Sequence, residues 1–186
     1  MGKLEALLQN YERYVALPWP QNLAGPQKVW FAVYDETDER RLRARLGEFE
    51  LATKRRDHRW SLCDLTNTFA EWMAQEQYRE SFFESPEDVE ITLGEFHNKV
   101  TQKLRVVLDD SQVNDQTVVS VHGIASLYGF MRVSQLVASV EQYIKGRLLV
   151  FFPGKHENNT YRLLDARDGW NYLAVPITAH EGARES

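Results

Sequence analysis

The stretch that decides the fold reads Gly146-Arg147-Leu148-Leu149-Val150-Phe151-Phe152-Pro153-Gly154. Its apolar core has the length of a strand, and it ends sharply at Pro153-Gly154, a pair typical of turns. A polar loop follows, and then two short strand-like segments within 158–165 and 170–177. The pattern predicts a buried strand that leaves a sheet and returns as a C-terminal β-ribbon at the sheet's edge.

Three earlier apolar runs of strand length lie at 28–34, 58–64 and 117–122. Together with 147–152 they alternate with segments whose apolar residues repeat at helical spacing. Long apolar runs of this kind are typical of strands that are buried on both faces, as in parallel sheets. The alternation therefore predicts an α/β fold with three layers, α/β/α, around a mostly parallel sheet.

The helices expected around this sheet lie at 3–16, from about 36 to 49, 68–80, 86–108 and 130–144. Ser85-Pro86 is a strong start for the long fourth helix, because serine caps a first turn and proline suits its first position. One apolar stripe runs along that helix: Val89, Leu93, Phe96, Val100, Leu104 and Val107. Gly146 is expected to cap the end of the last helix.

The length of 186 residues indicates a single domain over 1–186, with an N-terminal helix and linker at 1–26 and a flexible tail at 180–186. A net charge of −5 argues mildly against general nucleic-acid binding. Cys63 is the single cysteine, which fits a reducing compartment. The N-terminus lacks a secretory h-region and no apolar run reaches the length of a membrane span. We expect a cytoplasmic protein that does not contact membranes.

The loop from Gly123 to Gly129 follows the third strand, where α/β proteins place ligands. Backbone N–H groups around Gly123, Ser126 and Gly129 could hold an anion or a nucleotide phosphate. A P-loop and a dinucleotide-binding glycine motif are both missing from the sequence, however. Ser126 also lacks the sequence context of a hydrolase nucleophile, so a loop hydrogen bond is the better account of it.

Asp35 and Asp64 each end a strand, and His122 ends another. Paired carboxylates at this edge could bind a metal ion and act on phosphate esters. Both aspartates are followed by helix-start residues, so helix capping is the favoured interpretation. The five histidines show no metal-ligand spacing, and we expect neither a metal nor another cofactor.

Charge and aromatic residues are concentrated in separate segments. Positive charge gathers between the first two strands, at Arg40, Arg41, Arg43, Arg45, Lys54, Arg55, Arg56 and Arg59. Negative charge gathers on or before the long helix, at Glu84, Glu87, Asp88, Glu90 and Glu95. Such segments are typical of solvated helix faces, and the sharper alternative is a surface for a protein partner or nucleic acid.

Several pieces of the sequence resemble the BrxB family of BREX bacteriophage-defence systems. They are 119–132, Leu149-Val-Phe-Phe-Pro-Gly154, Asn158-Asn159, Tyr161-Arg-Leu-Leu-Asp165 and Asn171-Tyr-Leu-Ala-Val-Pro-Ile177. The resemblance is strongest over 115–177. The pieces around Phe31-Ala-Val-Tyr34-Asp35 and Phe69-Ala-Glu-Trp72 resemble a divergent branch of this family.

The resemblance implies a non-catalytic, interacting component of phage defence whose partner is the alkaline-phosphatase-like PglZ protein, with other BREX components as further partners. Arginines and aromatics dominate binding energy at interfaces, so the candidate contacts are Arg132, Arg162, Trp170 and Tyr172. The alternative is a nucleotide- or anion-binding protein or a metal-dependent phosphoesterase acting at the carboxyl edge of the sheet. A third hypothesis is a DNA-binding accessory protein, although we expect only indirect contact with nucleic acid.

Overall fold

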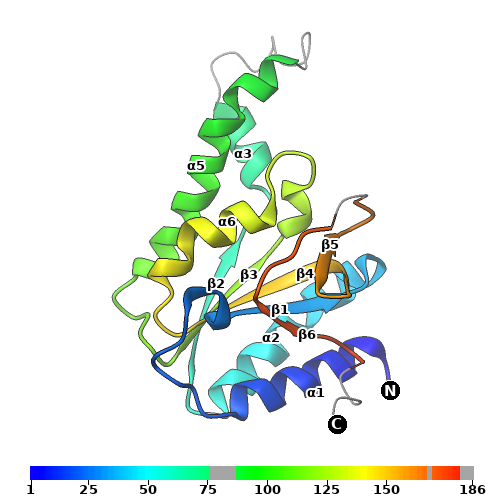
Figure 1. Cartoon of the computed structure of the whole chain (residues 1–186), viewed down its shortest axis with the longest axis vertical. Coiled ribbons are helices and arrows are strands. Elements are labelled where there is room, and N and C mark those ends of the chain that lie inside the picture. Colours follow the sequence, from blue (N-terminus) through cyan, green and yellow to red (C-terminus); the bar gives the residue numbers. More distant parts are fainter. Residues whose placement is uncertain (76–86, 167–168, 181–186) are drawn as a thin grey trace.

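The computed structural model describes residues 1–75, 87–166 and 169–180, without the side chains of residues 87–91. Helices cover both faces of a central sheet, as Figure 1 shows. The three-layer α/β/α fold with a mostly parallel sheet is therefore confirmed. No helix in the described part of the chain is long and apolar enough to cross a membrane.

The sheet has six strands in the spatial order β2-β3-β4-β1-β6, with β5 paired to β4 off this path. Their bounds are β1 Val29–Tyr34, β2 Arg59–Asp64, β3 Thr117–His122, β4 Arg147–Glu157, β5 Thr160–Leu163 and β6 Val175–Ile177. All pairs are parallel except β4 with β5. Every residue of β1 and β3 is buried, because helices cover both faces of these central strands.

Two helices cover one face of the sheet, and we call it the α1/α2 face. Leu7 and Tyr11 of α1 (Lys3–Ala16) and Phe49 of α2 (Glu39–Lys54) pack there against alternate residues of β1 and β4. The opposite face is covered by α3 (Thr68–Gln75), α5 (Glu87–Asp109) and α6 (Val133–Val140). Short 3-10 turns complete the chain: η1 Gly25–Lys28, η2 Glu36–Asp38, η3 Ile124–Leu127 and η4 Glu141–Tyr143.

The β-ribbon is formed by the second half of β4 and by β5. The first half of β4 pairs with β1 and β3, and its second half, from Gly154, pairs antiparallel with β5. A Cβ on Gly154 would lie 2.0 Å from the Arg162 carbonyl oxygen, so only glycine permits this approach. Asn158 and Asn159, both at positive φ, form the tight turn between the two strands. The ribbon thus extends from the carboxyl end of β4, and β6 occupies the sheet edge beside β1.

The last expected helix is shorter than its apolar repeat suggests. The spacing predicts a helix over 130–144, but α6 begins at Val133, ends at Val140 and continues only as η4. Gly146 therefore does not cap a helix. A Cβ there would lie 2.2 Å from the Thr117 carbonyl oxygen, so Gly146 is needed for close backbone packing where β3 and β4 begin.

The long helix agrees with its predicted stripe within the described side chains. Phe96, Val100 and Leu104 are buried, and Leu93 and Val107 pack against the same core at partial exposure. The expected helix start at Ser85-Pro86, the side chain of Val89, the end of the helix at 68–80 and the tail beyond His180 lie outside the described residues.

Replacing Phe96 by Ala is expected to lower the free energy of unfolding by about 3–5 kcal/mol, because its fully buried ring contacts Phe69, Trp72 and Phe130. Val106 lies on the same helix but is 60% exposed, so Val106→Ala is the matched control and should cost less than about 0.5 kcal/mol. Urea unfolding measures both. A loss below about 1 kcal/mol for Phe96→Ala would place its ring outside the core.

Candidate functional site

A polar network crosses the carboxyl edge of the sheet, where β1, β2 and β3 end. The Tyr34 hydroxyl donates to Glu39, and Glu39 accepts a hydrogen bond of 2.8 Å from Arg43. Arg43 donates in turn to the Thr66 hydroxyl over 3.1 Å. Nothing in the sequence pattern marks Tyr34 or Glu39 as members, apart from their closeness to the end of a buried strand. The network ties α2 to the turn after β2.

Asp64 and His122 are direct partners in the register between β2 and β3. The His122 Nε2 atom lies 3.5 Å from an Asp64 carboxylate oxygen, while Thr66 donates its backbone N–H to the other oxygen over 2.8 Å. Burial lowers the pKa of His122, and the nearby Asp64 carboxylate opposes this only in part. Burial acts to raise the pKa of Asp64, but hydrogen bonds from Thr66, with help from His122 and Arg43, outweigh it and lower that pKa.

The structure does not bring Asp35 and Asp64 together. They end β1 and β2, which are separated in the sheet by β3 and β4, a distance of about 14 Å at the usual strand spacing. Asp35 instead accepts hydrogen bonds from the backbone N–H and hydroxyl of Thr37, and it caps the turn that leads into α2. The described residues contain no cluster of His, Cys, Asp and Glu that could hold a metal ion.

The Gly123–Gly129 loop is held in place by hydrogen bonds of its own Ser126 side chain. The Ser126 hydroxyl reaches the carbonyl oxygens of Gly123 and Leu65, at 2.7 and 2.9 Å, so it joins the loops that follow β2 and β3. The expected loop hydrogen bond is therefore present. The turn after Gly123 is only the four-residue η3, and Gly129 follows it at a φ of +81°.

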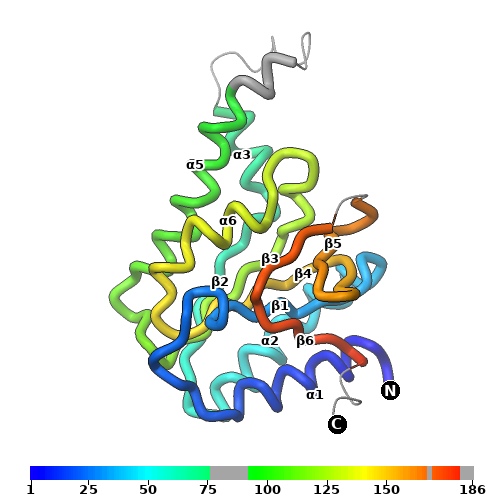
Figure 2. Tube along the Cα trace, in the orientation of Figure 1, coloured from blue at the N-terminus to red at the C-terminus, as the bar shows by residue number. Residues whose placement is uncertain are grey.

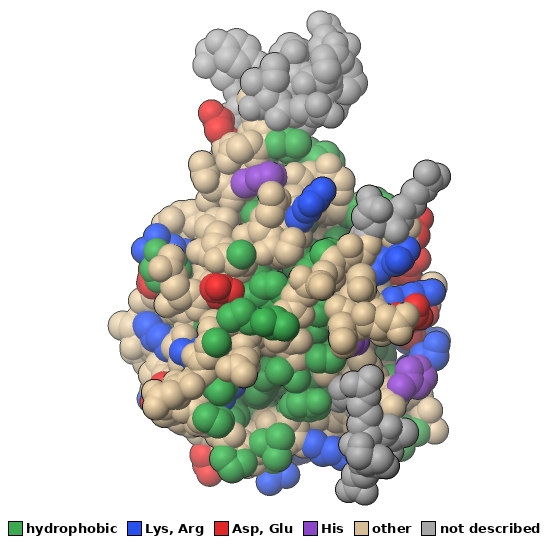
Figure 3. Space-filling view, in the orientation of Figure 1, with side chains coloured by type: hydrophobic (Ala, Val, Ile, Leu, Met, Phe, Trp, Pro, Cys, Tyr) green, Lys and Arg blue, Asp and Glu red, His purple; other side chains and the backbone are tan. Residues whose placement is uncertain are grey.

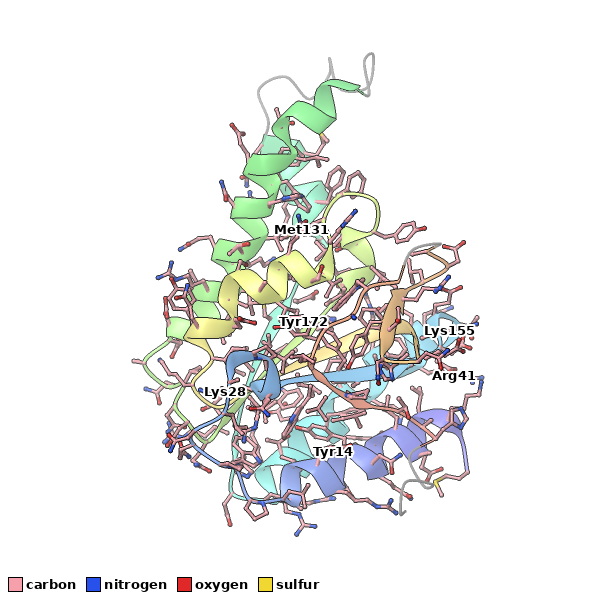
Figure 4. All side chains as sticks on the ribbon, in the orientation of Figure 1. Tyr14, Lys28, Arg41, Met131, Lys155 and Tyr172 are labelled. Carbon is pink, nitrogen blue, oxygen red and sulfur yellow. The ribbon has the colours of Figure 1, made fainter. Side chains whose placement is uncertain are left out.

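A cavity of about 800 Å³ opens beyond the carboxyl ends of β1 and β4. The connection after β1 runs through α2 on one face, and the connection after β4 returns over the other face, so the cavity lies where α/β sheets commonly bind ligands. Its wall carries charges of both signs, among them Lys3, Asp35, Lys155, Arg162 and Asp165. Figure 4 labels Lys155 and Arg41 on this side of the molecule.

Residues 169–174 cross the same face of the sheet as α6 on their way to β6 (Figure 2). The Trp170 backbone exchanges two hydrogen bonds with Tyr161, and its ring packs on Phe31 and Phe152. The Tyr172 ring packs beside Trp170 and Phe31, and its hydroxyl donates to Glu141 of η4. Both candidate aromatics are therefore half-buried and fixed to the sheet. Phe151 and Phe152 are fully buried core residues.

The two candidate arginines lie on different elements. Arg132 is exposed at the N-cap position of α6. Arg162 is exposed on β5, where it donates to the Ala166 carbonyl oxygen over 3.2 Å and borders the cavity. All four candidates thus lie in the C-terminal half of the chain, and the rings of Trp170 and Tyr172 are in direct contact.

Half of the basic segment is neutralised by carboxylates close by in the sequence. Arg41, Arg43, Arg45 and Lys54 each form an ion pair with a carboxylate three or four residues away. This arrangement agrees with the interpretation of the segment as a solvated helix face. Of the acidic segment, Glu95 is exposed on α5, while Glu84 and the side chains of Glu87, Asp88 and Glu90 lie outside the described residues.

Replacing Gly123 by Ala is expected to lower the free energy of unfolding by more than about 3 kcal/mol. A Cβ there would lie 2.4 Å from the Thr66 backbone nitrogen, and a φ of +81° is strained for any L side chain. Gly129 has the same φ but open space around it, so Gly129→Ala should cost only about 1–2 kcal/mol. Equal losses in thermal unfolding would show that the contact with Thr66 is not tight.

The lowered pKa of His122 predicts a loss of stability at acidic pH. The unfolded chain binds a proton at this position near the ordinary histidine pKa of about 6.5. The folded chain binds it only at lower pH, so the contribution of His122 is complete above that value and is lost as pH falls through the folded pKa. His122→Gln should therefore reduce the fall in the urea midpoint between about pH 6.5 and 5.

His58 also has a pKa lowered by burial. The His58→Gln variant is therefore the matched comparison, which tests whether a change in the pH dependence of stability is specific to His122. A His122→Gln variant whose stability falls in parallel with that of the unsubstituted protein would show that His122 does not titrate with unfolding.

The comparisons with known proteins give one family match. The model of the family described as BREX protein BrxB matches residues 61–177, which is well over half of the chain. The matched part includes most of β2, all of β3 to β6, the Gly123 loop and residues 169–174, which we call the aromatic crossing. No curated protein and no solved structure matches the chain. The chain therefore belongs to the BrxB family and is a component of a BREX bacteriophage-defence system.

Proposed function

We propose that this chain is a non-catalytic binding component of BREX-type defence, acting in the cytoplasm, and that its main partner is a PglZ-like protein. Membership in the BrxB family supports a role beside other BREX components. The observation that carries the proposal is a hydrophobic surface over the aromatic crossing and the turn that precedes β1. Figure 3 shows hydrophobic side chains gathered over the middle and lower part of this face.

Two residues of this surface are strongly exposed for their type. Leu173 is 81% exposed and Leu17 is 57% exposed. Trp19 packs on Trp30, whose neighbour on β6 is Val175. We call this surface the crossing face; its members are Leu17, Trp19, Pro26, Tyr172, Leu173, Val175 and Pro176. Exposed apolar side chains that gather on one face, rather than being scattered, are typical of protein interfaces.

The aromatic crossing is ordered before any partner arrives. Trp170 is fixed by backbone hydrogen bonds to Tyr161, and Tyr172 is fixed by Glu141 and Phe31. Leu173 follows directly and projects from this fixed backbone. Binding to such a surface costs little conformational entropy, because the side chains that support it are already held in place.

Three features support a non-catalytic role. The carboxylates of Asp35 and Asp64 cap turns on strands that are far apart. The Ser126 hydroxyl is bound to two carbonyl oxygens. Burial raises the pKa of the Cys63 thiol to about 12, so this thiol stays protonated and is a poor nucleophile at neutral pH.

Co-expression with the PglZ-like protein of the same defence locus should yield a complex that elutes together at micromolar concentration. Leu173→Asp should weaken this complex at least about tenfold, or about 1.4 kcal/mol, because it buries a charge in an apolar contact. Val106→Asp is the control, since Val106 is also strongly exposed but lies on α5. Arg132→Ala and Arg162→Ala test the two arginines, and Tyr172→Phe tests the hydroxyl without removing the packed ring.

Two results would contradict the proposal. Separate elution at micromolar concentration would exclude the partner, and a complex that is indifferent to Leu173→Asp would exclude the crossing face. The purified chain should also lack nucleotide hydrolysis and metal-dependent nuclease activity. Turnover that disappears on replacing Asp35, Asp64 or His122 would instead favour a phosphoesterase at the carboxyl edge.

A further inference from the structure

The opposite end of the sheet, where β1 to β4 begin, carries an unusual set of cations. We call it the amino edge. Two of these cations begin a strand, Arg59 in β2 and Arg147 in β4. The other two lie just before a strand, Lys28 before β1 and Lys145 before β4. Figure 4 labels Lys28 on the side of the sheet opposite Lys155 and Arg41.

These four cations contact backbone oxygens rather than carboxylates. Lys28 donates to Ile144, Lys145 to Val113 and Arg59 to Gln112, at 3.1 to 3.2 Å. Arg147 donates to the adjacent Gly146 carbonyl oxygen over 3.0 Å. Within the described part of the chain no carboxylate lies within ion-pair distance of any of the four, and Asp57 in the nearby turn is exposed and pairs with none of them. Four cations of α2 differ from them, because each pairs with a carboxylate three or four residues away.

Arg147 is the exceptional member because it is only 4% exposed. Its guanidinium carbon lies 4.8 Å from the centre of the Trp19 ring and 5.8 Å from the centre of the Trp30 ring, on the α1/α2 face. The His58 ring stacks on the Trp19 ring, with the two ring centres 3.6 Å apart and the planes nearly parallel. A cation buried among aromatic rings still leaves most of its five N–H donors without a strong acceptor.

Two further polar atoms beside Arg147 are buried without a partner. They are Nε1 of Trp19, which forms no hydrogen bond to any described residue, and Nδ1 of His58, for which no described residue is a well-aligned partner although backbone groups of Val15 and Gln116 lie near the ring. Buried polar groups are almost always hydrogen-bonded, so these atoms, beside a guanidinium whose acceptor is the adjacent Gly146 carbonyl oxygen, require an explanation. An acceptor that carries negative charge would satisfy the indole N–H and the guanidinium together.

We propose that Arg147, Trp19 and His58 form a receptor for a carboxylate side chain presented by an acidic, extended segment of a partner protein. The planar guanidinium suits the two oxygens of a carboxylate, and the indole N–H supplies a further donor. Lys28, Lys145 and Arg59 surround this receptor with positive charge that no acidic residue of the described chain neutralises. Charge complementarity therefore selects an acidic occupant.

A protein segment fits this receptor better than DNA does. Arg147 is almost fully buried, and Lys28, Lys145 and Arg59 each donate to a backbone carbonyl oxygen, so the four do not form the row of free cations that a phosphate backbone contacts. A single flexible carboxylate side chain can approach such a buried guanidinium more closely than a duplex backbone can. Trp19 is carried by residues 17–24, which form no helix or strand, so the indole can adjust without breaking regular structure.

The test uses the purified full chain and the indole ¹H–¹⁵N signal of Trp19, assigned by its loss in Trp19→Phe. The probe is a short, end-blocked peptide of alternating Glu and Gly, and the matched control replaces every Glu by Gln. The Glu peptide should shift the Trp19 signal in a saturable way, and added salt should weaken the effect. The Gln peptide should leave the signal unmoved.

Arg147→Met should weaken binding of the Glu peptide at least about tenfold. Arg41→Met, at the opposite edge, should not change it. Arg147→Lys keeps the charge but loses the planar fork, so it should show a smaller loss. If Arg147→Met does not fold, Arg147→Lys decides, and an affinity equal to that of the unsubstituted protein would overturn the proposal.

Three other outcomes would overturn it as well. The Trp19 signal could stay unmoved by the Glu peptide at millimolar concentration. Inorganic phosphate alone could saturate it as well as the peptide does, which would indicate a small-anion site. A short DNA duplex could shift it at lower concentration than the peptide, which would indicate nucleic-acid binding. Because the partner protein is absent from the experiment, each of these results leaves the proposed PglZ-like complex to its own test.

Discussion

The parallel pairing of β1 with β4 is the constraint on which the other elements depend. Residues Val29–Tyr34 lie beside Leu148–Pro153, and every residue in both stretches is buried. Alternate side chains of these strands point to opposite faces, so each face needs its own apolar cover. The α1/α2 face receives Trp30 and Phe151, while the face of α5 and α6 receives Phe31 and Phe152. The helices, and the edges that they leave free for function, follow from this requirement.

The two ends of the strands have different electrostatics as a result. At the carboxyl edge the turns are closed by side chains of the chain itself, through Asp35, Asp64 and the network from Tyr34 to Thr66. At the amino edge the cations donate hydrogen bonds to backbone carbonyl oxygens, and no carboxylate of the described chain balances their charge. A protein with a net charge of −5 thus keeps a local positive end, which the overall composition conceals.

The strands could be predicted from the sequence because each is an uninterrupted apolar run with no competing structure. The end of α6 could not, because the apolar repeat continues through the 3-10 turn η4 to Ile144. The distance between Asp35 and Asp64 was also beyond prediction, since chain order does not determine strand order. The Trp19–His58–Arg147 cluster joins three segments that are distant in sequence. Its only signal was a charged residue at the start of a strand that is otherwise entirely apolar in its first half.

The position of β1 has a consequence for how the chain folds as it is synthesised. Both neighbours of β1 come from the C-terminal part of the chain, β4 on one side and β6 on the other. Closing such a distant pairing requires a large loss of chain entropy before any strand contact is gained. On the ribosome, β1 therefore has to wait with both edges unpaired until β4 has emerged. During that interval α1 and α2 can cover only one of its two apolar faces, which leaves the other face open to aggregation.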